Sequence, residues 1–164
     1  MNISISAPAL VTIQDGFKRA PSMVQRELLA AATEASMLLE REVKDAMPAV
    51  SGLTRASVTS DAFSTPAGVL GVVGSAQVAA VALELGTKPH MPPVKALVPW
   101  VIEALGVEPK RAERVAFLVA RKIARVGTKA QKPFEKSLGV TQPQIVRMFE
   151  AAAGRIAAQL GGAA

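Results

Sequence analysis

The chain has 164 residues, half of them hydrophobic, a net charge of +6 and no cysteine. This length predicts one domain with a sizeable core, and the missing cysteines exclude disulfides and thiolate chemistry. No apolar stretch is long enough to span a bilayer, and the N-terminus lacks the basic and apolar regions of a signal peptide. We therefore expect a protein of a reducing compartment without a membrane partner.

The first half of the chain begins with a segment that we interpret as an N-terminal arm, residues 1–20. Residues 3–13 within it alternate loosely between apolar and polar, which predicts a short strand or an ordered arm. A single domain is expected over residues 21–164. From Met23 to Met47 the apolar residues recur at helical spacing, with a helix start at Pro21-Ser22. Pro48 is expected to end this helix, and Ser51-Gly52 to turn the chain.

After Gly52 the pattern changes from helical spacing to that of strands. Residues 53–63 are rich in Thr, Ser and Val, residues 69–74 are β-branched, and Pro66-Ala67-Gly68 lies between them. Two such runs around a turn predict a β-hairpin. Residues 76–85 are compatible with a third strand or a helix, and their alanines favour the helix. We expect an α+β fold in which the long N-terminal helix packs on a small antiparallel sheet from residues 53–75.

The C-terminal half is expected to be helical. Prolines make residues 88–93 a stiff, extended linker. Helical spacing follows over residues 94–105, with a kink or start at Pro99 and a cap at Gly106, and over residues 108–126 and 142–160. The residues of the second helix expected to face inward are Val115, Leu118, Val119, Ile123 and Val126.

Two segments share a short motif, Gly-Thr-Lys followed by a proline at the same offset. They are Gly86-Thr87-Lys88, with Pro92, and Gly127-Thr128-Lys129, with Pro133. Each closes an apolar run, so glycine is expected to end one element and proline to stop its immediate resumption. Neither motif is a phosphate-binding loop, because the upstream glycine is missing and lysine follows threonine instead of preceding it.

The residue types offer little for catalysis. His90 is the only histidine, and without a second histidine or a cysteine it has no partners for a metal site. We therefore interpret it as a polar turn residue and expect no enzyme activity and no cofactor. Glu84 stands in an apolar run before Gly86, where its carboxylate is expected to cap backbone amides or to pair with Arg55.

Basic residues crowd one stretch of the sequence. Such a stretch meets phosphates or an acidic protein surface, or forms a solvated helix face. No aromatic residues interleave with the cations, which argues against reading of nucleic-acid sequence. The candidate contact residues are Lys110, Arg111, Arg114, Arg121, Lys122, Arg125, Lys129 and Lys132.

The order of these motifs resembles a known family. A long amphipathic helix is followed by Pro48-Ala49-Val50-Ser51-Gly52-Leu53-Thr54-Arg55, a β-rich segment, Glu84-Leu85-Gly86-Thr87 with prolines, Trp100-Val101, and Gly127-Thr128-Lys129-Ala130-Gln131-Lys132-Pro133-Phe134 before a closing helix. Over residues 23–160 this is similar to the tail-completion, or neck, proteins of long-tailed double-stranded-DNA bacteriophages, the Z-like minor tail components.

The resemblance implies a structural protein of the virion that is assembled in the cytoplasm of the bacterial host. It implies a homo-oligomeric ring that completes the tail, with the head–tail connector, tail terminator and tail tube as partners, and non-specific contact with DNA in the channel. The motif residues carried over have structural roles: Pro48, Gly52, Arg55, Glu84, Gly86, Thr87, Gly127, Thr128, Pro133 and Phe134. The alternatives left open are a basic nucleic-acid-binding module and a small antitoxin-like regulator.

Overall fold

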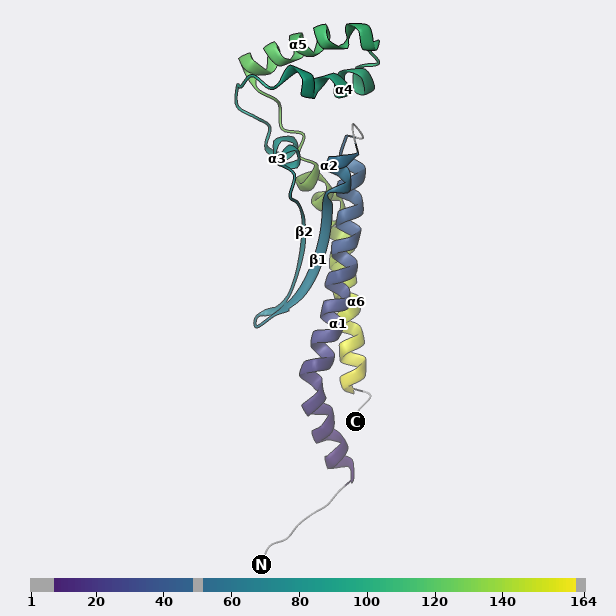
Figure 1. Ribbon diagram of the computed structural model, residues 1–164. Helices are drawn as coiled ribbons and strands as arrows, with labels where there is room; N and C mark the ends of the chain where they lie inside the picture. The colour runs from purple at the N-terminus through teal and green to yellow at the C-terminus, as the bar shows by residue number, and fades with distance from the viewer. Residues whose placement is uncertain (1–7, 49–51, 162–164) are drawn as a thin grey trace, which may run out of the picture. The chain divides into compact units, whose positions relative to one another are not determined.

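The computed structural model describes residues 8–48 and 52–161. Its elements, in chain order, are α1 (Pro8–Ala46), α2 (Leu53–Ala56), β1 (Val58–Thr65), β2 (Gly68–Ser75), α3 (Val78–Leu85), α4 (Val94–Leu105), α5 (Pro109–Val126) and α6 (Pro133–Gly161) (Figure 1). The long N-terminal helix, the two-stranded antiparallel sheet and the helical C-terminal half confirm the predicted α+β fold.

The chain forms two compact units, and each is assembled from separate stretches of sequence. The first contains the chain up to Leu38, residues 60–73 and the chain from Thr141 onward. The second contains residues 39–59 and 74–140. The unit boundaries fall inside α1, β1, β2 and α6, so these elements continue from one unit into the other. The single domain over residues 21–164 stays a prediction.

Helix α1 begins earlier than the sequence pattern indicates. It starts at Pro8 and contains Pro21, so the strand expected within residues 3–13 is wrong for residues 8–13, and residues 1–7 lie outside the described chain. Upstream of Pro21, Ile13 and Phe17 extend the spacing of Val24 and Leu28, which favours one continuous helix. The end of the helix at Ala46, just before Pro48, agrees with the prediction.

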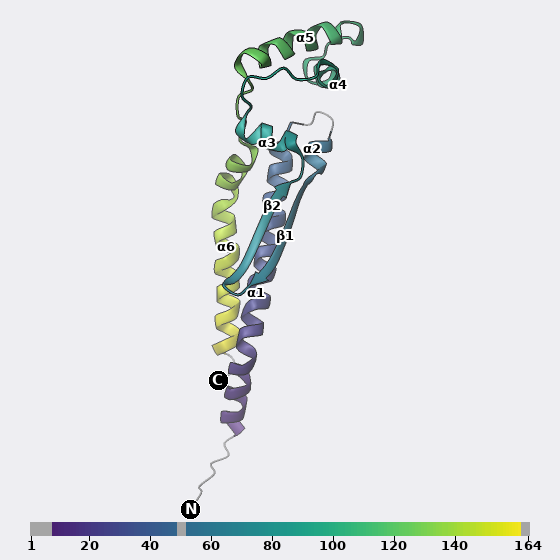
Figure 2. The same cartoon turned by 60° about the vertical axis from the view of Figure 1, so that its left-hand side comes forward.

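The β-hairpin packs on α1 through a glycine. Gly71 of β2 faces the helix so closely that an added Cβ would meet the hydroxyl of Ser36 and lie 3.3 Å from the carbonyl oxygen of Ala32. Ala32 and Ser36 are both buried, and the two strands run beside α1 in Figure 2. The strand predicted from Leu53 is wrong over its first residues, because Gly52, with φ of 64°, leads into the helical turn α2.

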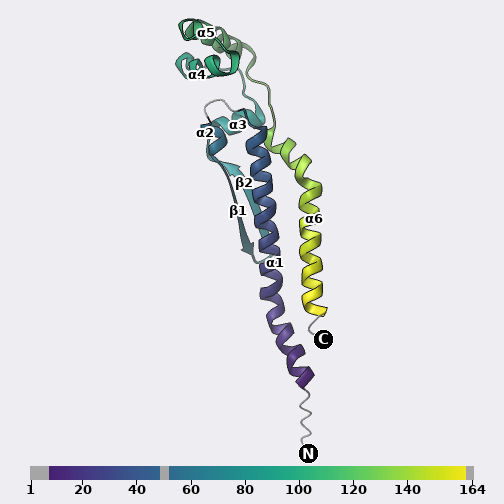
Figure 3. The ribbon, with the colours of Figure 1, turned by 90° about the vertical axis from the view of Figure 1, so that its right-hand side faces the viewer.

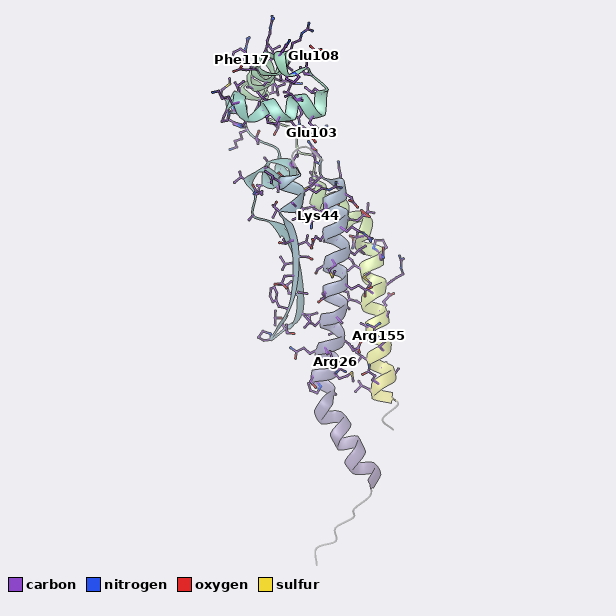
Figure 4. The ribbon with its side chains drawn as sticks, turned by 45° about the vertical axis from the view of Figure 1, so that its right-hand side comes forward. Arg26, Lys44, Glu103, Glu108, Phe117 and Arg155 are labelled. Carbon is purple, nitrogen blue, oxygen red and sulfur yellow. The ribbon has the colours of Figure 1, made fainter. Side chains whose placement is uncertain are left out.

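Helices α1 and α6 lie side by side and antiparallel within the first unit (Figure 3). Glu27 of α1 accepts a 2.9 Å hydrogen bond from Arg155 and a 3.1 Å bond from Gln159. Arg155 points toward α1 in Figure 4. The start of α6 at Pro133 corrects the start expected at Gln142, and the helix continues through Pro143.

Helices α4 and α5 form an antiparallel hairpin, both with nearly the predicted bounds (Figure 1). Gly106 ends α4 in the left-handed conformation, with φ of 62°. The hairpin core contains Val101, Ala112 and Ala116, none of them exposed to solvent. Small alanines let two helices approach closely. Leu118 and Val126, expected to face inward, are 56% and 62% exposed, because the alanine stripe turns them away from α4.

Candidate functional site

The two Gly-Thr-Lys motifs meet in space, which the sequence alone did not predict. Thr87 and Thr128 form an isolated antiparallel bridge in which each backbone N–H donates to the other residue's carbonyl oxygen at 3.1 Å. Their hydroxyl oxygens are 3.0 Å apart. We call this pair of segments, Gly86-Thr87 and Gly127-Thr128, the Gly-Thr crossing. It joins the chain at the point where it enters and leaves the α4–α5 hairpin.

Both positions that precede the threonines require glycine. Gly86 and Gly127 have φ of 71° and 72°, with extended ψ, a conformation that side chains other than glycine rarely adopt. A Cβ at Gly86 would lie 2.5 Å from the carbonyl oxygen of Thr128, and one at Gly127 would meet the carbonyl oxygen of Thr87. The prediction that these glycines end α3 and α5 is therefore confirmed, and their close approach adds a second reason for glycine.

Glu84 ties the crossing to the start of α6. Its two carboxylate oxygens accept hydrogen bonds from the backbone N–H groups of Phe134, at 2.8 Å, and Glu135, at 3.1 Å. A carboxylate at this place satisfies amides of the first helical turn and complements the positive end of the helix dipole. The expected capping role of Glu84 is thus confirmed. Pro133, buried at the first position of α6, has no N–H to satisfy.

The segment between the crossing and α6 is held by one more backbone group. The carbonyl oxygen of Leu83 accepts bonds from the N–H groups of Gln131 and Lys132. Lys132 adopts a positive φ of 58° and pairs with Glu135 at 2.6 Å. The hydrogen bond and charge of Glu135 raise the pKa of Lys132 above its ordinary value. Residues 83–88 and 127–135 therefore form a single network of backbone and side-chain contacts.

Arg55 does not pair with Glu84, which corrects that expectation. Its guanidinium donates to the carboxylate of Asp45 at 2.8 Å, and the side chains of Arg55 and Asp45 are 38% and 64% exposed. The partner comes from the end of α1, just before Pro48, whereas Gly52 supplies the turn that brings Arg55 back. This pair therefore fixes the turn after α1, and Glu84 fixes the start of α6.

His90 is exposed, and its Nδ1 lies 2.9 Å from the carbonyl oxygen of Lys88. Across residues 8–48 and 52–161, no group of three or more His, Asp or Glu side chains is arranged to hold a metal ion. No helix in that part of the chain is long and apolar enough to cross a membrane. The geometry thus assigns His90 to the turn after the crossing.

The basic candidates fall into two groups. Lys129 and Lys132 follow the crossing, and the others belong to α5, where every one of them is exposed: Lys110, Arg111, Arg114, Arg121, Lys122 and Arg125. With Glu113 as its only acidic residue, α5 has a net charge of +5, nearly the whole +6 of the chain. The charge of this protein is therefore a property of one helix.

Four of these cations form a stripe on α5 opposite the buried alanines. Residues 110, 114, 121 and 125 project to one side at 100° per residue. Phe117 and Leu118 occupy the gap between Arg114 and Arg121, one on each side of the stripe, and are 46% and 56% exposed. Phe117 lies on the side of α5 away from α4 in Figure 4. We call these six residues the outer face of α5.

The sequence pattern did not predict the apolar centre of this face. It indicated that Leu118 faces the core, and it gave no role to Phe117. The spacing of Ala112, Ala116 and Ala120 was the available signal, because a stripe of small residues marks the side of closest helix approach. Comparisons of the chain with protein-family models, curated proteins and solved structures find no match.

Proposed function

We propose that this chain is a structural protein of the bacteriophage neck that completes the tail and joins it to the head-side connector. The observation that supports the proposal most is the Gly-Thr crossing. Two motifs of the resemblance, 41 residues apart in sequence, belong to one network in which Glu84, Gly86 and Thr87 contact Thr128 and Phe134. The motif residues thus have structural roles that explain why these residue types stand there.

The proposed partners are the neck and tail proteins named by the resemblance: the head–tail connector, the tail terminator and the tail tube. In this proposal the chain acts as one subunit of a ring, without a cofactor and without turnover. A ring requires a heterologous interface that repeats around an axis. The surfaces available are exposed ones outside the Gly-Thr crossing, since the threonines there bind each other.

The test uses a phage that carries the gene with a nonsense codon, grown in suppressing and non-suppressing hosts. We expect the protein in purified particles from the suppressing host, and unjoined heads and tails without it. A matched strain with the codon in a dispensable gene controls for suppression itself. Infectious, full-tailed particles that lack the protein would contradict the proposal.

The charge of α5 supports a second candidate, a nucleic-acid-binding module. A helix with a net charge of +5 attracts a duplex, and such binding weakens steeply with salt through counterion release. Anisotropy titrations of a duplex at increasing salt measure this directly. Tight binding that persists near physiological salt would favour this candidate over the neck protein.

A further inference from the structure

We propose that the outer face of α5 is a docking surface for an acidic protein partner, one that presents an apolar site bordered by carboxylates. This deepens the proposed function, since it names the chemistry of the neighbour that one exposed helix binds. It rests on that function only for the partner's place in the virion.

The positive charge of α5 determines that the partner's binding surface is negatively charged. The chain has 19 basic and 13 acidic residues. Helix α5 contains six of the basic residues and one of the acidic residues. Helices of this length extend over about 27 Å, so the stripe presents its cations along one straight line. Exposed cations at this density repel one another, and an acidic counterpart relieves that repulsion and speeds encounter.

The apolar centre of the face decides between a protein and a nucleic acid. Phe117 and Leu118 lie at the middle of the stripe, with Lys110 and Arg114 toward one end and Arg121 and Arg125 toward the other. An apolar centre within a charged border is the anatomy of protein interfaces, where aromatic residues contribute most of the binding energy. A phosphate backbone would leave both apolar side chains without a counterpart.

A second copy of the chain does not fit this face. Outside α5, the remaining residues are 13 basic and 12 acidic, so they offer no matching negative excess. Self-association through this face would bring a positive helix to a chain whose remaining residues carry a net charge of +1. Charge complementarity therefore selects a different, acidic protein.

Fluorescence anisotropy with defined probes tests the proposal on the purified full chain. The acidic probe is a helical peptide of about 20 residues, matched to the length of α5, with a leucine stripe between glutamates. A scrambled peptide of the same composition and a duplex of about 20 base pairs are the other probes, all in about 150 mM salt. The variants are Phe117→Ser with Leu118→Ser, and Arg114→Gln with Arg121→Gln. The control, Lys136→Gln with Arg147→Gln, removes the same charge at two exposed positions outside α5.

We expect the wild type to prefer the helical peptide to both other probes. The serine variant should weaken peptide binding about tenfold or more and leave duplex binding unchanged. The glutamine variant should weaken both, and the control should match the wild type for the peptide. Circular dichroism verifies that the variants remain folded, since all four substituted positions on α5 are exposed.

Three results would overturn the proposal. They are no peptide binding up to about 1 mM, peptide binding that ignores the serine substitutions, and tighter binding of the duplex than of the peptide. The last would assign the face to nucleic acid. Absence of the protein from virions would contradict the neck function but not the peptide binding by the outer face of α5. Failure of the neck function and failure of the docking surface are therefore distinguishable.

Discussion

Gly86 and Gly127 share one backbone conformation. At each of them the backbone of the opposite segment passes within contact distance. Each residue combines a positive φ with an extended ψ, so the chain leaves α3 and α5 in the direction that pairs Thr87 with Thr128. At these two residues, backbone conformation and close packing require the same amino acid. Other glycines with positive φ in the described chain, such as Gly106, face open space.

This difference predicts unequal effects of alanine. Gly127→Ala should destabilise the protein by about 3 kcal/mol or more, because an unfavourable φ is joined by a clash with the Thr87 carbonyl. Gly106→Ala, with positive φ in open space, should destabilise it by about 1 kcal/mol. Urea unfolding followed by circular dichroism measures both, and equal effects would contradict the close approach.

Glu84 carries a prediction of its own. Glu84→Ala removes two charge-assisted hydrogen bonds to the first turn of α6 and should destabilise the protein by about 2 kcal/mol. Glu84→Gln keeps an acceptor oxygen and should lose less. Arg55→Ala, which breaks an exposed pair with Asp45, should lose under about 1 kcal/mol.

A double-mutant cycle then examines whether Glu84 and Arg55 are independent. Since they share no partner, their effects should add within about 0.5 kcal/mol. A larger coupling energy would restore the pairing that the structure excludes.

At the scale of elements, the contact between α1 and α6 includes an ion pair, Glu27 with Arg155, whose contribution to stability depends on pH. The hydrogen bond from Arg155, then that from Gln159, holds the pKa of Glu27 below its ordinary value of 4.5. A carboxylate whose folded pKa is depressed stabilises the protein above its unfolded pKa. That stabilisation is lost as the pH falls through the folded pKa.

Stability should therefore decline as the pH falls below 4.5, and part of that decline should be absent in Glu27→Gln. Urea midpoints measured from neutral to acidic pH give the two curves. Glu34→Gln, an exposed change on the same helix, is the control and should follow the wild type. Identical curves for Glu27→Gln and the wild type would show that the pair contributes no pH-dependent stability.

The elements that the sequence predicted well are those whose signals are local. The α4–α5 hairpin has Gly106 at one end and Pro109 at the start of the next helix, and the turn of the β-hairpin lies at Pro66. Local rules failed at Pro21 and Gln142, where helices were expected to start, because α1 continues through Pro21 and α6 continues through Pro143. Each proline removes one backbone donor, and the residues on both sides of it continue the helix.

The candidate site was predictable only in its parts. The sequence indicated that Gly86 and Gly127 end their elements and that Glu84 caps backbone amides or pairs with Arg55, because each role was inferred from neighbouring residues or motifs. It gave no indication that Thr87 and Thr128 bind each other, since a pairing across 41 residues depends on the path of the chain between them. For the same reason the partner of Arg55 was assigned to Glu84 instead of Asp45.

At the scale of the whole molecule, the crossing makes the α4–α5 hairpin an insertion with adjacent ends. Replacing residues 89–126 by a Gly-Ser linker of about four residues should leave the remaining elements folded, because closing a short loop between paired strands demands little entropy. The denaturant dependence of unfolding should fall in proportion to the surface removed.

The matched control replaces residues 59–74 with the same linker. It removes the contact of Gly71 with α1 and should unfold the first unit. Circular dichroism and urea unfolding compare the two deletions. A molten or unfolded product from the first deletion would show that the hairpin is needed for the fold of the rest.

The crossing also determines how the protein would bear a mechanical load. A pull on the α4–α5 hairpin reaches Thr87 and Thr128 in the same direction, because the two strands leave the crossing together. Their mutual hydrogen bonds are then not sheared, and tension is divided between two covalent backbones. One backbone leads into α3, the other toward α6, and Glu84 links the two. Such an attachment passes the load to α3 and α6 without shearing the hydrogen bonds between Thr87 and Thr128.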